Sequence, residues 1–266
     1  MIQNRTHGNC ALTVTLLLVC LLINAPALGQ RSFEEVGDSL YAHFENVGAL
    51  EAYSKARTAT PTLSVLFKTA VAANEIAQDL EAEGRRDEAE EMYRVAIDHA
   101  EKLRDAYPEQ AASWFILAAT NGKMAQFSGG RDKVKIGRAV EEYYTRAITL
   151  DSTYALAYMV AGIFNREVAQ LSWIQKLAAR ALFGGVPDGS LEQSQAYLEK
   201  ALKLDNTLLI AHFELAQTYI ALGKPDKADS HLRFLRVLSP RSSEEVRVKA
   251  RAAALLSPAN SSDQPQ

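Results

Sequence analysis

The residues with the plainest chemistry are the basic side chains between positions 123 and 138. Five of them share this segment with a single acid: Lys123, Arg131, Lys133, Lys135 and Arg138. Two glycines, at 129 and 130, precede the last four, so we expect a Gly-rich basic loop beside a helix start. Such a loop can bind an anion through backbone N–H groups and cationic side chains. The alternative is a solvated loop whose charges keep the protein soluble.

Patterns that support catalysis or metal binding are missing from the sequence. After the first 30 residues the histidines are His43, His99, His212 and His231, and no two stand four residues apart. The Gly-x-Ser-x-Gly turn of hydrolases does not occur, nor do carboxylates at metal-ligand spacing. We therefore expect no enzymatic activity, no cofactor and no metal.

The composition predicts a globular protein that does not bind nucleic acid. Of 266 residues, 48% are hydrophobic and 23% charged, which supplies enough apolar surface for a core. Lys and Arg number 29 against 32 Asp and Glu, a net charge of −3. Dedicated nucleic-acid binders carry a strongly basic balance instead.

The first 29 residues have the features of a secretory signal. Arg5 precedes an apolar run at 11–23, and Ala27 and Gly29 supply the small residues that a signal peptidase needs. We expect cleavage after Gly29 and an exported protein, periplasmic or secreted. The alternative is a protein anchored in the membrane by an uncleaved N-terminal segment, although the run is short of the about 20 residues of a spanning helix. Both cysteines lie in this segment, at 10 and 20.

Between residues 32 and 256 the apolar positions follow the period of an amphipathic helix. Ala89, Tyr93 and Ala96 recur at intervals of three and four, as do Leu215, Tyr219 and Leu222. Glycine and proline fall between such segments. The sequence therefore predicts a succession of helices.

One of these segments, 209–240, resembles a tetratricopeptide repeat, a helix hairpin of about 34 residues. The large and small positions of that family fall here at His212, Leu215, Ala216, Tyr219, Gly223, Ala228, Leu232, Leu235 and Pro240. Small residues let the two helices approach closely. A single hairpin cannot bury its apolar face, so the resemblance implies a stack of such units.

Three more units align on the same positions. The small position of the first helix falls at Ala77, Ala118, Gly162 and Ala216, and its counterpart in the second helix at Ala96, Ala147, Ala201 and Leu235. The interval between them is longer in the second and third units, which predicts an insertion in each. We expect an all-α fold, a right-handed α-solenoid of about four hairpins over residues 30–256. Helices at 32–47 and 243–256 would cap it, and 257–266 would be a disordered tail.

The second insertion, 172–190, predicts a short amphipathic helix closed by glycines. Its apolar and basic residues include Trp173, Leu177, Arg180 and Phe183. This helix could fold into the concave groove, lie on a membrane or fill a groove of a partner. It could also pack on the solenoid as additional core.

The concave face of tetratricopeptide repeats is lined by the first helix of each hairpin. The alignment predicts that the groove contains Phe115, Lys123, Met159, Ile163, Arg166, Phe213, Gln217 and Ile220. An apolar lining with two cations suits an amphipathic ligand. The alternative is that the second insertion covers this face and makes it core.

Three stretches around the insertions resemble a narrower family. They read GKMAQFSGGRDKV at 122–134, NREVAQLSW at 165–173 and LFGGVPDGSLE at 182–192. With the surrounding residues 49–254 they look like bacterial exported relatives of the regulator of microtubule dynamics family of animals. The resemblance implies a helical repeat fold and a non-enzymatic role. Animal members are linked to microtubules, and one branch binds and transfers phospholipids.

These observations leave two hypotheses of function. The first is an exported scaffold that binds a protein or peptide in its concave groove. The alternative is a carrier or binder of phospholipid or another anionic amphiphile, with groove residues around the chain and basic residues near the head. An open groove favours the first, and a deep apolar pocket sealed by 173–183 favours the second.

Overall fold

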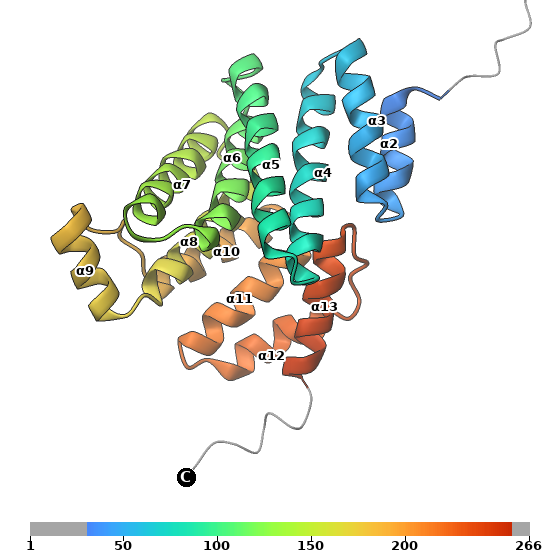
Figure 1. Ribbon diagram of the computed structural model, residues 1–266. Coiled ribbons are helices and arrows are strands. Elements are labelled where there is room, and N and C mark those ends of the chain that lie inside the picture. The colour runs from blue at the N-terminus through green and yellow to red at the C-terminus, as the bar shows by residue number, and fades with distance from the viewer. Residues whose placement is uncertain (1–30, 257–266) are drawn as a thin grey trace, which may run out of the picture. The chain divides into compact units, whose positions relative to one another are not determined.

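The computed structural model describes residues 31–256, and these residues form helices joined by short connections (Figure 1). The predicted signal at 1–29 and the predicted disordered tail at 257–266 lie outside the described residues. The helices are α2 (Phe33–Ala42), α3 (Asn46–Ala59), α4 (Leu63–Ala82), α5 (Arg86–Ala106), α6 (Ala111–Met124), η1 (Ala125–Phe127), α7 (Gly130–Leu150), α8 (Ala155–Ala169), α9 (Trp173–Phe183), α10 (Leu191–Leu204), α11 (Leu209–Ala221), α12 (Pro225–Phe234) and α13 (Ser243–Leu255).

The four predicted hairpins are α4–α5, α6–α7, α8–α10 and α11–α12, and each packs against the next. All eight predicted small positions are buried, among them Ala77, Ala118 and Ala216 with no exposed surface. At Gly162 a Cβ atom would lie 2.4 Å from Leu198 Cγ, so only glycine permits this approach of α8 to α10. The sequence prediction of a tetratricopeptide-like solenoid is confirmed.

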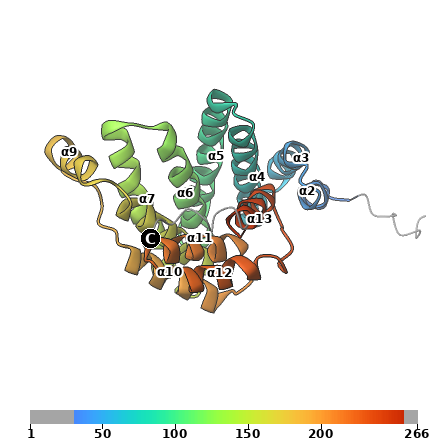
Figure 2. The same ribbon diagram turned by 90° about the horizontal axis from the view of Figure 1, so that it is seen from below.

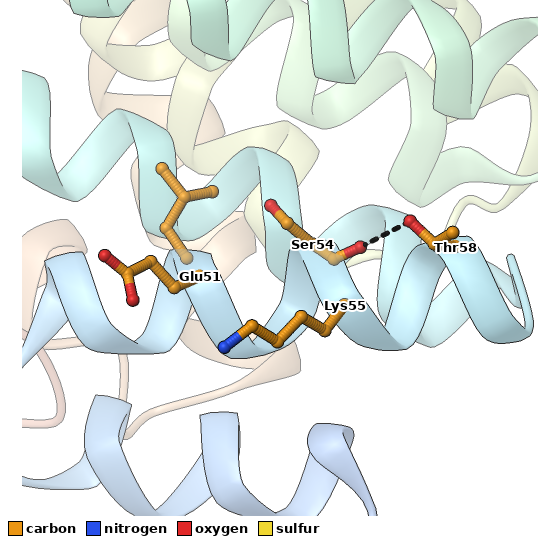
Figure 3. Close-up of a pocket in the computed structure, with 5 residues that line it drawn as sticks. Glu51, Ser54, Lys55 and Thr58 are labelled. Atoms are coloured by element: carbon orange, nitrogen blue, oxygen red, sulfur yellow. Dashed lines mark hydrogen bonds between the residues drawn. The ribbon is translucent and has the colours of Figure 1, made fainter.

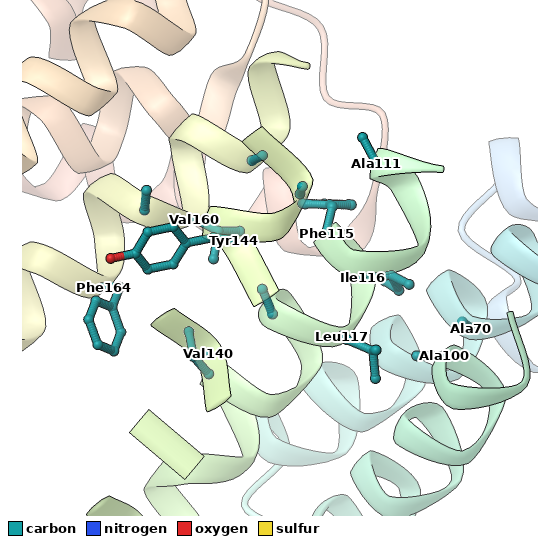
Figure 4. Packing of buried hydrophobic residues seen from close by; sticks show 14 of the residues in the cluster. Ala70, Ala100, Ala111, Phe115, Ile116, Leu117, Val140, Tyr144, Val160 and Phe164 are labelled. Atoms are coloured by element: carbon teal, nitrogen blue, oxygen red, sulfur yellow. The ribbon is translucent and has the colours of Figure 1, made fainter. Parts of the chain in front are cut away.

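The main core lies where α4, α5, α6, α7 and α8 meet (Figure 4). Aromatic rings fill much of it: Tyr144 lies 5.5 Å from Phe164 and Phe115 lies 5.7 Å from Tyr154, measured between centroids. A second core joins α8 and α10 to α11, α12 and α13. Burial of apolar side chains between successive hairpins therefore holds the stack together.

The N-terminal cap differs from the single helix predicted at 32–47. That helix ends at Ala42, and a turn containing Phe44, whose φ is 62°, leads into the separate helix α3. The two helices form a further hairpin, because Gly37 lets Tyr53 lie against the backbone of α2. The C-terminal cap at 243–256 is confirmed as α13.

The prediction that residues 128–138 form a Gly-rich basic loop is wrong. Only Ser128 and Gly129 are extended, and α7 begins at Gly130, so Arg131, Lys133, Lys135 and Arg138 are helical. Val134 explains the difference, because its side chain is buried and fixes the first turns of α7 against the fold. Gly129 lies in the turn before the helix, and Gly130 begins the helix with a φ of 54°.

The helix predicted in the second insertion is confirmed as α9. Ser172 and Gln175 form a reciprocal capping box at its start, and Gly184 ends it in the left-handed conformation with φ 77°. Within residues 31–256, no helix has both the length and the apolar character needed to cross a membrane.

Candidate functional site

The first helices of the four hairpins present one common face, which we call the helix-A face. It is formed by α4, α6, α8 and α11, and the predicted groove residues lie on the last three of these helices. In both views the last helix, α13, lies beside α4 and α11 (Figures 1 and 2). The helix-A face therefore already holds a helix, and that helix belongs to the chain itself.

Polar contacts join the start of α13 to three helices that are distant in the sequence. Lys123 Nζ of α6 donates to Glu244 Oε1 at 2.7 Å. Arg247 pairs with Asp79 of α4. Asn46 of α3 donates through Nδ2 both to Asp79 Oδ2 at 2.8 Å and to Ser243 Oγ at 3.0 Å. Arg251 extends these contacts to α11, because its guanidinium lies 4.6 Å from the ring centroid of Phe213.

Glu75 of α4 is the buried acid beneath this contact. Its Oε2 accepts the backbone N–H of Glu244 at 3.2 Å, near the positive end of the α13 dipole. Burial, reinforced by the negative charge of Glu244, raises the pKa of Glu75 to about 7. This carboxyl therefore changes protonation near neutral pH.

A buried ion pair lies deeper in the same face. Arg166 of α8 donates from Nη2 to Glu214 Oε2 of α11 at 2.5 Å, and both residues are buried. Burial raises the pKa of Glu214 above its ordinary value although Arg166 and Lys123 act in the opposite direction. Charges of alternating sign thus run along the helix-A face from Arg166 towards α13.

The predicted groove residues do not line an open groove. Phe115, Met159 and Phe213 are only 7, 8 and 1% exposed and lie within the two cores, which corrects their assignment to a ligand-accessible lining. Ile163 and Gln217 are half-buried, and Ile220 is exposed. The physical reason is that neighbouring hairpins pack over most of the apolar stripe, while α13 lies against α4 and α11. Arg166 is buried as well, so Ile220 and the partly exposed Lys123 are the most accessible of these residues.

The insertion helix α9 lies away from the helix-A face and packs against α7 (Figures 1 and 2). Only Ala179 of its residues is buried. Leu177 and Trp173 are 57 and 73% exposed, so their side chains contribute little to the core. Arg180 is exposed and Phe183 is half-buried against α7. Helix α9 therefore does not fill the predicted groove, whereas Val186, which follows it in the same insertion, packs against the main core.

Two hollows of the surface lie along α3, and the second includes Asn46 and Asp79 of the α13 contact. One, of about 500 Å³, is lined by five residues that all come from α3 (Figure 3). Another, of about 380 Å³, lies between the start of α3 and the end of α4. A hollow with a single helix as its wall cannot enclose a small ligand. Among residues 31–256 no group of three or more potential ligands is placed to hold a metal ion.

The histidines of the last hairpin form a pair. His212 Nδ1 and His231 Nδ1 lie 2.8 Å apart, and the other ring nitrogen of His212 is 3.0 Å from the carbonyl oxygen of Asn206. Burial lowers the pKa of both rings, so the neutral forms are favoured. The pair joins α11 to α12, and the nearby charge of Glu199 partly opposes the effect of burial on His231.

Sequence reasoning missed the residues that seat α13. These are Glu75, Asp79, Glu244 and Arg247. One signal was available: Glu75 stands in an otherwise apolar stripe of α4, where a charge is costly unless a partner satisfies it. The identity of that partner could not be read from the sequence, because it follows 169 residues later.

The fold and the helix-A face define a tetratricopeptide-like repeat protein with its last helix seated on the face that the first helices form. A thermophilic tetratricopeptide-repeat protein of Thermus thermophilus has a similar solved structure, with a TM-score of 0.59 over 84% of this chain and 97% of that one. The two sequences are 17% identical, so this likeness concerns the fold alone.

The chain belongs to the regulator of microtubule dynamics family. The family model described as regulator of microtubule dynamics protein 1-3 matches residues 34–260. Protein 1 of mouse is 23% identical over 195 residues, which is 72% of this chain and 63% of the mouse protein. Protein 1 of Caenorhabditis elegans is 25% identical over 228 residues, or 82% of this chain and 96% of the relative. The chain thus spans less than two thirds of the mouse relative.

Proposed function

We propose that this protein is a non-enzymatic adaptor that binds a helical segment of a protein partner on its helix-A face. The observation that carries the proposal is the seating of α13, whose Glu244, Arg247 and Arg251 meet a cation, an acid and an aromatic ring on that face. A surface that holds one amphipathic helix offers the same complementarity to another.

The contact between α13 and the helix-A face contains unfavourable features that would let a partner helix take the place of α13. Arg247 Nη2 and Arg166 Nε are buried and have no hydrogen-bond partner among the described residues. Glu75 keeps its acid group buried beside Glu244, another acid. Unsatisfied polar groups and like charges reduce the stability of an interface. A partner helix that satisfies them would replace α13.

The phospholipid-carrier alternative requires an accessible apolar lining, and the residues predicted to form that lining are buried. Phe115, Met159 and Phe213 were to surround an acyl chain, but their side chains are occupied by core contacts. Helix α9, which was to seal the pocket, lies against α7 instead. We therefore favour a protein or peptide partner. The relatives are named as regulators of microtubule dynamics, and for this chain we propose protein binding without that particular target.

We also propose that the adaptor acts outside the cytoplasm, released or anchored by its N-terminus. The features of residues 1–29 support export, with cleavage after Gly29 or retention as an anchor as the two possibilities. The mass of the protein recovered from cell fractions distinguishes them. A full-length protein in the cytoplasmic fraction would contradict export.

A peptide of residues 242–256 tests the helix-A face directly. In the double variant Glu244→Lys with Arg247→Glu, α13 loses its ion pairs while the net charge of the chain is unchanged. We expect the labelled peptide to bind this variant at least tenfold more tightly than the wild type, in which α13 competes. The matched control exchanges charges on the outer face, Glu90→Lys with Arg94→Glu, and should behave as the wild type.

A photocrosslinker at Ile220, an exposed residue of the same stripe, then identifies the partner in cells. A protein captured there and displaced by the 242–256 peptide supports the proposal. Equal peptide binding by wild type, double variant and control would contradict it, as would a captured protein that the peptide does not displace.

A further inference from the structure

A second surface, formed by α9 and the start of α7, is independent of the helix-A face. On α9 the exposed apolar residues are Trp173, Ile174, Leu177 and Leu182, each more than half exposed. At 100° per residue they fall within one half of the helix circumference. Ala179 lies outside that half and is the residue that packs inward. An isolated helix thus turns a continuous apolar face to solvent, which soluble proteins rarely do without a purpose.

Basic residues surround this face. Lys176 and Arg180 lie along one border of the apolar half of α9. On α7, Arg131, Lys135 and Arg138 follow one another at intervals of four and three and so share a side of the helix. Arg138 Nη2 donates to the carbonyl oxygens of Phe183 at 3.2 Å and of Gly185 at 3.0 Å. These bonds place the basic stripe of α7 at the C-terminal end of α9.

These cations have no acid partners within residues 31–256. No ion pair joins Arg131, Lys133, Lys135, Arg138, Lys176 or Arg180 to a carboxylate there, whereas Arg85, Arg94 and Arg166 are all paired. The acids near them in sequence are Asp132, Glu141, Glu142 and Asp188, fewer than the six cations. A local excess of positive charge therefore accompanies the apolar face, in a chain whose net charge is −3.

The geometry points to a negatively charged lipid bilayer as the occupant of this α7–α9 surface. A bilayer provides both parts at once: an apolar interior for Trp173 and Leu177, and anionic headgroups for the cations around them. Lys and Arg side chains at the border of an apolar face reach up to the headgroups while their stems remain in contact with the acyl region. Because none of the described helices can span a membrane, the docking would be peripheral.

The local structure of α9 fits such docking. Its capping box at Ser172 and its left-handed Gly184 satisfy both ends of the helix with groups from its own segment. Both caps therefore stabilise the helix from within its own segment while its apolar face stays exposed. Considered alone, the two cations of α9 give weak attraction to a membrane, and the structure adds the three that share one side of α7.

Vesicle binding tests this inference in the compact unit Phe33–Gln266, which contains the hydrophobic cores described above. Trp114 is replaced by Phe, so that Trp173, the other of the two tryptophans, is the only indole reporter. With vesicles of phosphatidylcholine and phosphatidylserine in equal parts we expect co-flotation and a blue shift of Trp173 emission. Vesicles of phosphatidylcholine alone should bind much more weakly, and added salt should weaken binding to the anionic ones.

Two variants separate the electrostatic and apolar contributions. Arg131→Glu with Lys135→Glu should reduce binding to anionic vesicles at least about thirtyfold, since each basic residue near such a surface contributes about a fivefold factor and the added carboxylates are repelled. Leu177→Glu should reduce it about tenfold or more through loss of an inserted side chain. The matched controls are Lys203→Glu with Arg236→Glu, and Val237→Glu, all at exposed sites away from α7 and α9, and both should bind as the parent.

Three results would overturn the inference. The first is no flotation of the parent protein with anionic vesicles. The second is binding that the α7 and α9 variants leave unchanged. The third is a blue shift of Trp173 with soluble polyglutamate but not with vesicles, which would assign the surface to an acidic protein instead.

Discussion

Helices α9 and α13 are of similar length, 11 and 13 residues, but have opposite surroundings. Helix α9 buries one alanine and is defined by caps from its own segment. Helix α13 buries Val248 and Ala252, and partners that precede it by 121 to 197 residues hold its first turns. The comparison teaches that a local sequence pattern can specify a helix without saying which surface it will meet. In the two proposals above, α13 stabilises and occupies the helix-A face, and α9 docks the protein on a membrane.

The largest expected effect concerns the buried ion pair between Arg166 and Glu214 of the helix-A face. Arg166→Ala leaves Glu214 charged and buried without a partner, so we expect a loss of about 3–5 kcal/mol in the free energy of unfolding. Denaturant titration measures it. Arg166→Met combined with Glu214→Leu should recover most of the loss, because both charges are then gone. A small effect of the single variant would mean that water reaches Glu214 and that the helix-A face is open.

The next test truncates one aliphatic side chain on each helix. Val248→Ala removes buried methyl groups from α13 and should cost about 2 kcal/mol, from lost burial and an incompletely closed cavity. Leu177→Ala removes a larger group from α9 but should change the free energy of unfolding by less than about 0.5 kcal/mol, because the side chain is exposed. Thermal unfolding followed by circular dichroism compares them. Equal costs would show that α9 is covered in solution.

A third test uses pH. The folded state raises the pKa of Glu75 from 4.5 to about 7, so the folded protein retains a proton that the unfolded chain releases. Stability from this group is therefore present below pH 4.5 and is lost as the pH rises through 7. Glu75→Gln should be neutral at pH 4 and stabilising by about 1–2 kcal/mol at pH 8. A constant difference across this range would place Glu75 in contact with water.

The parts of the fold that could be predicted from the sequence depend on local or repeated patterns. The small positions, from Ala77 to Leu235, identified all four hairpins because each unit repeats the same packing requirement. The helix at 173–183 was predicted from its spacing and its closing glycines. By contrast, the glycines and charges at the start of α7 predict a loop, because only one residue there, Val134, carries the signal of a buried helical position.

The candidate site was predicted only in part, because it depends on the superhelical twist of the stacked hairpins, which brings the last helix close to the first hairpin. The alignment selected the right side of the first helices, and Lys123 and Arg166 do take part in the charge network there. It could not show that Phe213 would be covered by Arg251, 38 positions later in a cap outside the repeats. No periodicity within a repeat encodes a contact between the first unit and the last helix.

The smallest effect should come from the more exposed end of the same network. Lys123 and Glu244 are 2.7 Å apart, but their side chains are 40 and 19% exposed, so solvent screens the pair. Lys123→Ala should therefore cost only about 0.5–1 kcal/mol in the free energy of unfolding. The exchange of both charges, Lys123→Glu with Glu244→Lys, tests more than the pair: it also places a cation beside Glu75. We expect it to restore stability and to lower the pKa of Glu75, measured by NMR titration. If the exchange restores neither the stability nor an ordinary pKa of Glu75, the position of α13 depends on its apolar contacts alone. The charges of Lys123 and Glu244 then serve only to select the partner that binds the helix-A face.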